Sequence, residues 1–407
     1  MKKTVLKQYA RLIARVGGNV QKGQEVLVLA GLDQPEFVQM VVEECYRAGA
    51  KKVHVDWTYQ PLAKVHARWQ KEKVLSVTEE WEKAKLQHMV DTLPVRIFLD
   101  SDDPDGMRGI HPRFFKAMQA RAAVRKPYRD AIDNKHQWCI AAVPGEAWAK
   151  KLYPKLSKKQ ALEQLWKDIL FTSRADGEDP VAAWEEHNAD LKRRCEHLNG
   201  LRLRELRYKS ANGTDFTVGL IPQGRFHAGC DTTLQGVVFN PNIPTEEVFT
   251  SPDRRTAEGI VYSTKPLSFQ GQLIENFSLR FEKGRVVEVK AEKGQDVLEY
   301  LVSMDDASHY LGECALVPKD SPISESGLLF YNTLFDENAA CHLAVGAGFN
   351  ECVEGFASMT DEELYELGVN DSINHTDFMI GSEDLSIDGV TADGKVVPIF
   401  RNGTWAF

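Results

Sequence analysis

Short apolar runs alternate with longer amphipathic segments through the first half of the chain. Residues 25–30 form an apolar run, and apolar side chains then recur at helical spacing over residues 35–48. A second apolar run follows at 52–57, so this region predicts a strand–helix–strand unit with buried parallel strands. Further strands are predicted at 95–100 and 138–143, and helices at 112–124, 158–173 and 180–198. Residues 1–198 are therefore expected to form an N-terminal α/β domain with a mainly parallel sheet.

The hydrophobic pattern changes after residue 198, where strict alternation replaces the long apolar runs. Residues 201–220 and 279–289 alternate polar and apolar positions around glycine turns that open at Asn212 and Lys283, which predicts two β-hairpins. Helices are predicted at 295–303, 336–346 and 360–367. Residues 199–407 are therefore expected to form an α+β domain with antiparallel sheet.

Composition narrows the class of protein. The 407 residues carry 50 Lys and Arg against 59 Asp and Glu, a net charge of −9, and they contain no long basic run, so a nucleic-acid partner is not expected. No apolar stretch approaches the roughly 18 residues that a membrane-spanning helix needs. The seven cysteines never form a C-x-x-C pair. The chain is accordingly expected to be cytoplasmic, with reduced thiols and no membrane partner.

The N-terminal half lacks the glycine-rich loops that bind nucleotides. No G-x-G-x-x-G sequence and no P-loop opens a predicted helix. An acidic loop at 100–105 follows a predicted strand, a place where α/β folds bind ligands. Because Asp and Pro also favour solvent-exposed turns, a plain turn is the simpler interpretation of this loop.

Carboxylates and imidazoles recur together in the second half of the chain. His375 and Asp377 lie two residues apart in a predicted extended segment, so their side chains point to the same face. Glu337 precedes His342 by five positions, in a segment with Asp336 as a predicted helix N-cap. Each pair also has a plainer interpretation. The first would be a surface ion pair, and the second a carboxylate at a helix start followed by a hydrogen-bonded core histidine.

Two further glutamates, Glu247 and Glu313, lie in short polar turns next to apolar sequence. Burial of an unpaired carboxylate costs several kcal/mol, so each of them needs a cation partner if it is buried. Oxygen donors combined with neutral imidazole nitrogens suit Zn²⁺, Co²⁺ or Mn²⁺. The hypothesis is that these scattered groups converge on a metal centre that activates water.

Around these residues the sequence resembles the thermophilic aminopeptidase family of metallopeptidases, which includes aminopeptidases T and S and the PepS enzymes. The similarity extends along the whole chain and is carried by residues 242–253, 312–318, 331–339 and 375–381. The resemblance implies a homodimer with a C-terminal catalytic domain and a pair of divalent metal ions, Zn²⁺ or Co²⁺, with Mg²⁺ and Mn²⁺ as alternatives. The metal ligands that it implies are Glu247, Glu313, Glu337, His342, His375 and Asp377.

The implied reaction releases the N-terminal amino acid from peptides that have a free N-terminus. Two metal ions polarise the scissile carbonyl and lower the pKa of a bridging water, and Glu246 or Glu337 is predicted to take the proton of that water. Family members usually carry a tyrosine seven residues after the first ligand histidine, whereas Phe349 stands here. Because a phenyl ring donates no hydrogen bond, the alternative function is a metal-binding protein that binds peptides with weakened turnover.

A serine or cysteine hydrolase is the other class of enzyme that the residues could suggest. Such an enzyme needs a nucleophile next to a base, and no G-x-S-x-G sequence is present. Cys341 adjoins His342, but neighbouring side chains on the predicted helix point apart. The sequence therefore predicts no catalytic dyad at this pair.

Overall fold

The computed structural model describes all 407 residues, and the chain divides into two compact units. The first unit comprises Met1–Glu185 together with Cys230–Pro244, and the second comprises Glu186–Gly229 together with Thr245–Phe407. The domain bounds 1–198 and 199–407 stay a prediction.

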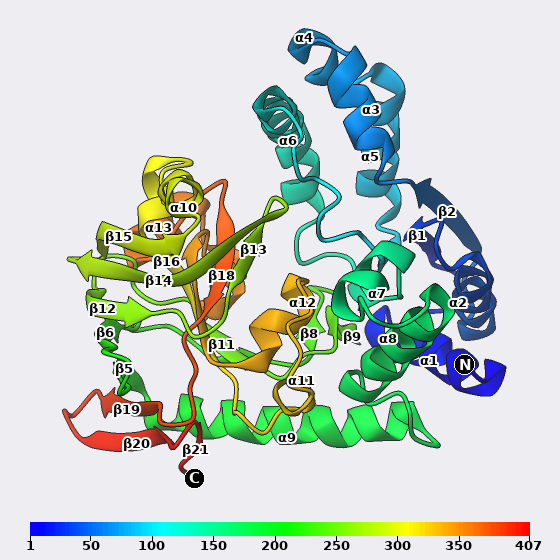
Figure 1. Ribbon diagram of the computed structural model, residues 1–407. Helices are drawn as coiled ribbons and strands as arrows, with labels where there is room; N and C mark the ends of the chain where they lie inside the picture. Colours follow the sequence, from blue (N-terminus) through cyan, green and yellow to red (C-terminus); the bar gives the residue numbers. More distant parts are fainter. The chain divides into compact units, whose positions relative to one another are not determined.

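The first unit is built on a five-stranded sheet in which all neighbouring strands run parallel, in the order β10-β4-β3-β1-β2. Its paired strands β1 and β2 are labelled in Figure 1. Apolar side chains such as Val28 and Ile97 are fully buried, as expected for strands between covering helices. The mainly parallel sheet predicted for this part of the chain is confirmed. Its strands are β1 (Glu25–Gly31), β2 (Lys52–Thr58), β3 (Val95–Asp100), β4 (Trp138–Ala142) and β10 (Asn242–Ile243).

Aromatic packing joins the helices of the first unit. The ring of Tyr9 lies 5.5 Å from that of Phe37 and 6.4 Å from that of Trp166, centroid to centroid, which connects α1, α2 and α8. Helix α6 continues beyond its predicted end at 124, because burial of Ile132 anchors its last turn. The helices are α1 (Lys3–Leu12), α2 (Pro35–Ala48), α3 (Leu62–Trp69), α4 (Glu72–Leu75), α5 (Glu80–Thr92), α6 (Pro112–Ile132), α7 (Glu146–Leu152) and α8 (Lys158–Thr172). A π-helical turn (Ile13–Gly17) follows α1, and the helix α9 (Pro180–Leu201) follows α8 along the chain. Two short strands, β8 (Asp231–Thr232) and β9 (Val238–Phe239), pair with each other.

The second unit contains a nine-stranded antiparallel sheet, in the order β13-β14-β12-β6-β5-β19-β20-β21 with β15 on the outer side of β14. The two hairpins predicted from alternation are confirmed as the pairs β5–β6 and β14–β15. The strands are β5 (Leu203–Lys209), β6 (Asp215–Gly219), β12 (Glu258–Tyr262), β13 (Leu267–Phe269), β14 (Gln272–Glu282), β15 (Arg285–Lys293), β19 (Ser386–Thr391), β20 (Val396–Arg401) and β21 (Thr404–Trp405).

A second antiparallel sheet of the same unit, in the order β18-β17-β16-β11-β7, carries the candidate chemistry. One of its faces packs into the hydrophobic core through residues such as Leu316, Leu343 and Phe378. The strands are β7 (His227–Ala228), β11 (Val248–Thr250), β16 (Leu311–Leu316), β17 (His342–Gly346) and β18 (His375–Met379), and the nearby helices are α10 (Gln295–Val302), α11 (Pro322–Glu325), α12 (Thr333–Asp336) and α13 (Asp361–Leu367).

Residues 336–346 do not form the helix that their sequence predicted. The helical backbone ends before Ala340, whose φ of −163° and ψ of 163° are extended, and His342 then opens β17. The prediction was wrong because a short apolar run has no periodicity that separates a buried strand from a helix. Asp336 is likewise not the predicted N-cap, since its carboxylate accepts hydrogen bonds from the backbone N–H groups of Phe330 and Asn332.

Two expectations from composition concern the whole chain. No helix is both long and apolar enough to cross a bilayer. All seven cysteines are free thiols, so no disulfide braces either unit. A cytoplasmic location stays a prediction.

Candidate metal centre

Three adjacent strands place two carboxylates in one row. Glu313 of β16 lies opposite Ala344 of β17, and Ala344 lies opposite Asp377 of β18. Directly opposed side chains of an antiparallel pair project from the same face, so both acids leave the sheet together with only the methyl group of Ala344 between them. The next residues, Cys314 and Phe378, point into the core. The row therefore belongs to the face that does not form the core.

A β-bulge turns Glu313 to this face. Leu311 is opposite Val345, and Glu313 is opposite Ala344, so Gly312 is one extra residue in β16. Without the bulge, Glu313 would alternate onto the core face together with Leu311. A Cβ at Gly312 would overlap the carbonyl oxygen of Ala347, so only glycine fits here.

The two histidines flank this row on the same face. His342 begins β17 two residues before Ala344, and His375 begins β18 two residues before Asp377. Nε2 of His375 lies 3.2 Å from Oε2 of Glu313 and 3.3 Å from Oδ1 of Asp377. The prediction that His375 and Asp377 share a face of an extended segment is confirmed.

Glu247 joins the group from the neighbouring strand. It immediately precedes β11, which pairs with β16, and its Oε2 lies 3.2 Å from Nε2 of His342. Candidate ligand atoms therefore form two groups that share Glu313. The first consists of Glu247, Glu313 and His342, and the second of Glu313, His375 and Asp377. Within each group all ligand atoms lie within 4.8 Å of one another. The structure thus brings together five of the six residues that the resemblance implies.

Backbone carbonyls orient both imidazoles. Nδ1 of His342 lies 3.2 Å from the carbonyl oxygen of Ala340, and Nδ1 of His375 lies 2.8 Å from that of Ala347. A carbonyl oxygen only accepts hydrogen bonds, so Nδ1 carries the proton in each ring. Nε2 is left to face the carboxylates, which is the arrangement of metal-ligating histidines.

The charges of the group call for a cation. Burial, together with the carboxylate of Glu247, raises the pKa of Glu313 to about 7. Burial opposes protonation of His342, but its hydrogen bond to Glu247 raises the pKa of this imidazole to about 10. Burial alone would raise the pKa of Asp377, yet His375 lowers it to about 2. Oδ1 of Asp377 is buried and accepts no hydrogen bond. The donor set, oxygens and imidazole nitrogens with an orphaned buried oxygen, fits a divalent metal.

The two predicted bases differ in their surroundings. Burial, and then the charge of Asp377, raises the pKa of Glu337 well above its usual value, which places Glu337 beside the group. The carboxylate of Glu246 instead lies 3.8 Å from Nε2 of His187 and belongs to neither ligand group. Asn338, which is fully buried, donates to Oε1 of Glu337 at 3.3 Å and accepts from the backbone N–H of Glu246 at 2.8 Å. This amide connects the two acidic segments.

Sequence patterns did not single out Asn338. Asn338 lies in the sequence between the candidate acid Glu337 and an apolar run. An amide in such a place is buried and must form hydrogen bonds, and this was the only sign of its role. A single sequence does not show which partners it finds, because Glu246 lies far away along the chain.

Comparison with known proteins decides the family. The chain matches the thermophilic metalloprotease family (M29) over residues 2–405. The chain belongs to this family. The resemblance drawn from the sequence is therefore confirmed.

Curated relatives in this family are aminopeptidases. The chain is 45% identical to aminopeptidase AmpS of Bacillus subtilis (strain 168), over 99% of this chain and 98% of that protein. It is 42% identical to aminopeptidase 2 of Geobacillus stearothermophilus, with the same coverage, and 39% identical to aminopeptidase T of Thermus thermophilus, over 98% of each. Family and relatives together make the chain a metalloaminopeptidase.

Solved structures agree at the level of the fold. Wild-type AmpT from Thermus thermophilus superposes with a TM-score of 0.92 at 38% identity, covering all of both chains. The 2,5-dihydroxypyridine dioxygenase of Pseudomonas putida KT2440 has a TM-score of 0.52 at 14% identity, over 99% of this chain and 96% of that one. The second likeness concerns the fold alone.

Phe349 lies directly beside the centre of this M29 protein. Its ring centroid is 5.0 Å from that of His375 and 5.3 Å from that of Phe249. Its backbone N–H donates to Oγ of Ser251 at 2.7 Å, which fixes the position of the ring. The position where the family resemblance implies a tyrosine hydroxyl thus presents an apolar surface.

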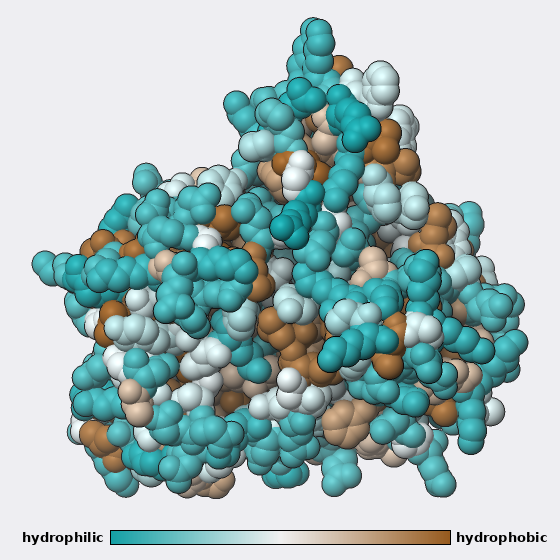
Figure 2. Space-filling view, in the orientation of Figure 1, coloured by the Kyte–Doolittle hydropathy of each residue, from teal (hydrophilic) through white to brown (hydrophobic).

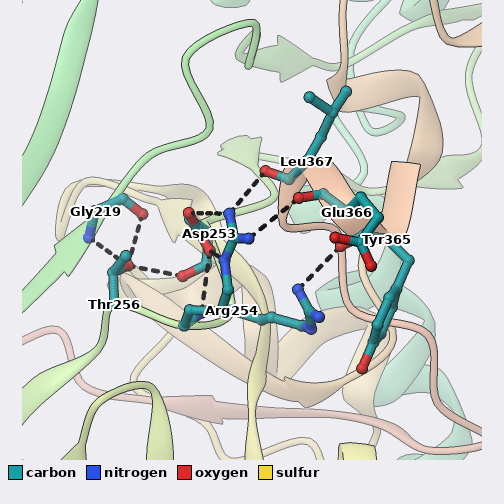
Figure 3. A network of polar contacts seen from close by, with 8 residues as sticks. Gly219, Asp253, Arg254, Thr256, Tyr365, Glu366 and Leu367 are labelled. Carbon is teal, nitrogen blue, oxygen red and sulfur yellow. Dashed lines mark hydrogen bonds and ion pairs between the residues drawn. The ribbon is translucent and has the colours of Figure 1, made fainter. Parts of the chain in front are cut away.

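A polar network anchors the chain segment that connects β17 to β18 and carries Phe349 (Figure 3). The guanidinium of Arg255 donates to Asp253 and, over 3.1 Å, to the carbonyl oxygen of Glu366. Arg254 donates to the carbonyl oxygen of Tyr365 at 3.0 Å. Cations at the C-terminal end of α13 also interact favourably with the helix dipole. The network therefore connects the turn after β11 to the segment beside the centre.

Proposed function

We propose that this aminopeptidase holds two divalent metal ions, Zn²⁺ or Co²⁺, and uses them to remove N-terminal residues from peptides. The observation that supports this most directly is the pair of ligand groups that share Glu313. Removing several carboxylates from water without a cation carries a large desolvation penalty, so the site requires positive charge. The proposed ligands are Glu247, Glu313, Glu337, His342, His375 and Asp377.

Bound metal ions would polarise the scissile carbonyl and lower the pKa of a water molecule. Glu337 is the side chain that we assign to receive the proton of that water, because burial and the charge of Asp377 raise its pKa and make its carboxylate a stronger base than an ordinary glutamate. The carboxylate of Glu246 faces the imidazole of His187 instead of the ligand groups. The contact of Glu246 with the site is the hydrogen bond that its backbone N–H donates to Asn338. Of the two bases that the sequence predicted, the surroundings favour Glu337.

Charge also supports action at the N-terminus of a peptide. The centre gathers four carboxylates, Glu247, Glu313, Glu337 and Asp377, and two imidazoles. A free α-amino group can bind one of the metal ions or one of these carboxylates, whereas an internal peptide bond offers no such group. His375, with 29% of its side chain exposed, marks the side from which a substrate reaches the centre.

Chelation tests the requirement for metal. We expect EDTA to abolish hydrolysis of an aminoacyl-p-nitroanilide, and Co²⁺ or Zn²⁺ added to the dialysed protein to restore it. Elemental analysis should find two metal ions per chain in the restored protein. Undiminished activity in the chelator would refute the proposed chemistry, and one tightly bound ion per chain at full activity would refute the two-ion centre.

The variant His375→Ala tests the ligand assignment. We expect it to lose at least one metal ion and at least 100-fold in kcat/KM while still unfolding cooperatively, because the residue lies at a half-open edge of the site. His54→Ala, at an exposed position of β2, is the matched control and should keep both properties. Full metal content in His375→Ala would exclude His375 as a ligand.

A further inference from the structure

A cavity of about 970 Å³ lies within the first unit, at the carboxyl end of its parallel sheet. The last residues of β1 and β3, including Gly31 and Asp100, form its floor, and Thr58 at the end of β2 adjoins them. Helices α3, α4, α5 and α6 supply most of its other walls. A cavity of this size accommodates a small organic molecule.

The strand order gives this place its significance. The strands of this sheet lie in the order β2-β1-β3-β4-β10. After β1 the chain forms β2 on one side of β1, and it then forms β3 on the opposite side of β1. The connections therefore diverge between β1 and β3, which opens a crevice outside the carboxyl ends of these two strands. Open α/β sheets bind their ligands at such a switch point. The cavity is lined by the ends of these two strands.

Many of the side chains that line the cavity are apolar or aromatic. Tyr59, Leu62 and Trp81 line it and remain 47% to 70% exposed, while Phe98 and Phe114 lie deeper. Brown apolar patches on the helices α3 to α6, at the top of the view, belong to this part of the unit (Figure 2). Exposed aromatic side chains around a cavity are typical of a binding site for an apolar group.

The strand ends are acidic. Asp100 and Asp102 line the cavity, and the backbone N–H of Asp102 donates to Oδ1 of Asp100 at 3.0 Å, which keeps the two residues close. Partial burial and the negative charges of Asp100, Asp33 and Asp103 raise the pKa of Asp102 to about 6. An anion is therefore repelled at this edge, and the absence of a glycine-rich loop agrees with that.

The charges at the helical end largely satisfy one another. Glu82 forms ion pairs with Arg121 and Arg125, and all three side chains line the cavity. These pairs leave one positive charge in excess at this end. The cavity is thus acidic at the strand ends, apolar in the middle and weakly basic at the helices.

We propose that this cavity binds a small organic ammonium ion that carries an aromatic or branched apolar group. The ammonium group interacts with Asp100 and Asp102, and the apolar group packs against Tyr59, Trp81 and Phe114. All of these residues belong to the first unit and none is a candidate metal ligand, so either proposal can fail without the other.

Isothermal titration of the full-length metal-loaded protein with phenethylamine tests the proposal. We expect a binding site that Asp102→Asn weakens at least tenfold, since the substitution removes charge and keeps shape. Asp130→Asn, an exposed position of α6 outside the cavity, is the matched control and should bind as the wild type does. The site should persist in His375→Ala, which separates it from any amine bound at the metal centre.

Neutral and anionic analogues complete the test. Phenethyl alcohol and phenylacetate should each bind at least tenfold more weakly than phenethylamine. L-Phenylalanine separates the sources of the ligand: tighter binding than phenethylamine identifies an amino acid or peptide whose carboxylate reaches the arginines, and weaker binding identifies a simple amine. Equal affinity of Asp102→Asn and wild type, or equal affinity for the alcohol and the amine, would overturn the proposal.

Discussion

Replacing Phe349 with tyrosine is the change that the structure makes most informative. The ring lies 5.0 Å from the imidazole of His375, and its backbone is held by Ser251, so the substitution adds a hydroxyl group and moves little else. The family resemblance implies a tyrosine at this position. A phenol can donate a hydrogen bond to negative charge that develops on the reacting carbonyl, which phenylalanine cannot do.

The size of the effect follows from two opposing terms. One well-aligned donor to a developing oxyanion contributes about 2.7–4 kcal/mol. A hydroxyl that is partly buried and imperfectly paired in the free enzyme costs about 1–3 kcal/mol. Phe349 is only half-buried, so the lower part of that cost applies. With a cost of about 1 kcal/mol, about 1.7–3 kcal/mol of the gain remains, so we expect kcat to rise roughly 20- to 150-fold.

Steady-state hydrolysis of aminoacyl-p-nitroanilides, with metal content measured in parallel, is the assay. Phe249→Tyr adds the same hydroxyl to the neighbouring ring, 5.3 Å from Phe349, and serves as the matched control with unchanged kcat. The reasoning fails if Phe349→Tyr leaves kcat unchanged at full metal occupancy, because another group then already supplies the donor. It also fails if both variants gain equally, since position would then not matter.

Three further predictions concern the support of the centre. Gly312→Ala, whose Cβ would overlap the carbonyl of Ala347, should lose metal and at least 100-fold in kcat/KM, whereas Gly177→Ala, in open space, should change neither. Asn338→Ala should lower the free energy of unfolding by about 1–3 kcal/mol, measured with urea, because buried partners lose their hydrogen bonds. The pKa of His342 is raised to about 10, so the folded metal-free protein keeps a proton that the unfolded chain releases near 6.5. Stability of the chelated protein should therefore fall as pH rises from 6.5 to 10, and His342→Gln should remove this contribution in urea titrations.

The parallel sheet of the first unit could be predicted because its signals are local. Strands such as β1 and β3 are continuous apolar runs, and α2 has a clear helical period that ends at Gly49, which adopts the left-handed conformation. The hairpins of the second unit carried turn residues at Asn212 and Lys283. The apolar run at 336–346 fits either a helix or a buried strand. Its second half forms the buried strand β17, so the helical prediction was wrong.

The candidate ligands could be named from the sequence for a different reason from the fold. His375 and Asp377 lie on one strand, so their shared face follows from the period of two along a strand. Glu247, Glu313 and His342 were each singled out by their settings beside apolar sequence, and the family resemblance joined them into one ligand set, because no local pattern relates residues on different strands. The dyad at Cys341 was correctly set aside, but for the wrong reason: the two residues lie in extended backbone, where neighbouring side chains point to opposite faces, and the thiol of Cys341 donates to Val317 in the core.

The residue that decides the geometry of the centre has no side chain. In β16 the alternation from Leu311 would send Glu313 into the core, where an ionised carboxylate has no partner. The extra residue, Gly312, reverses that alternation and delivers Glu313 to the face of Asp377, where both ligand groups need it. Chemistry at this site therefore depends on register, and register depends on a position that only glycine can occupy. A single sequence shows that glycine but not its strand partner, which is why the candidate ligands could be named from the sequence and their arrangement could not.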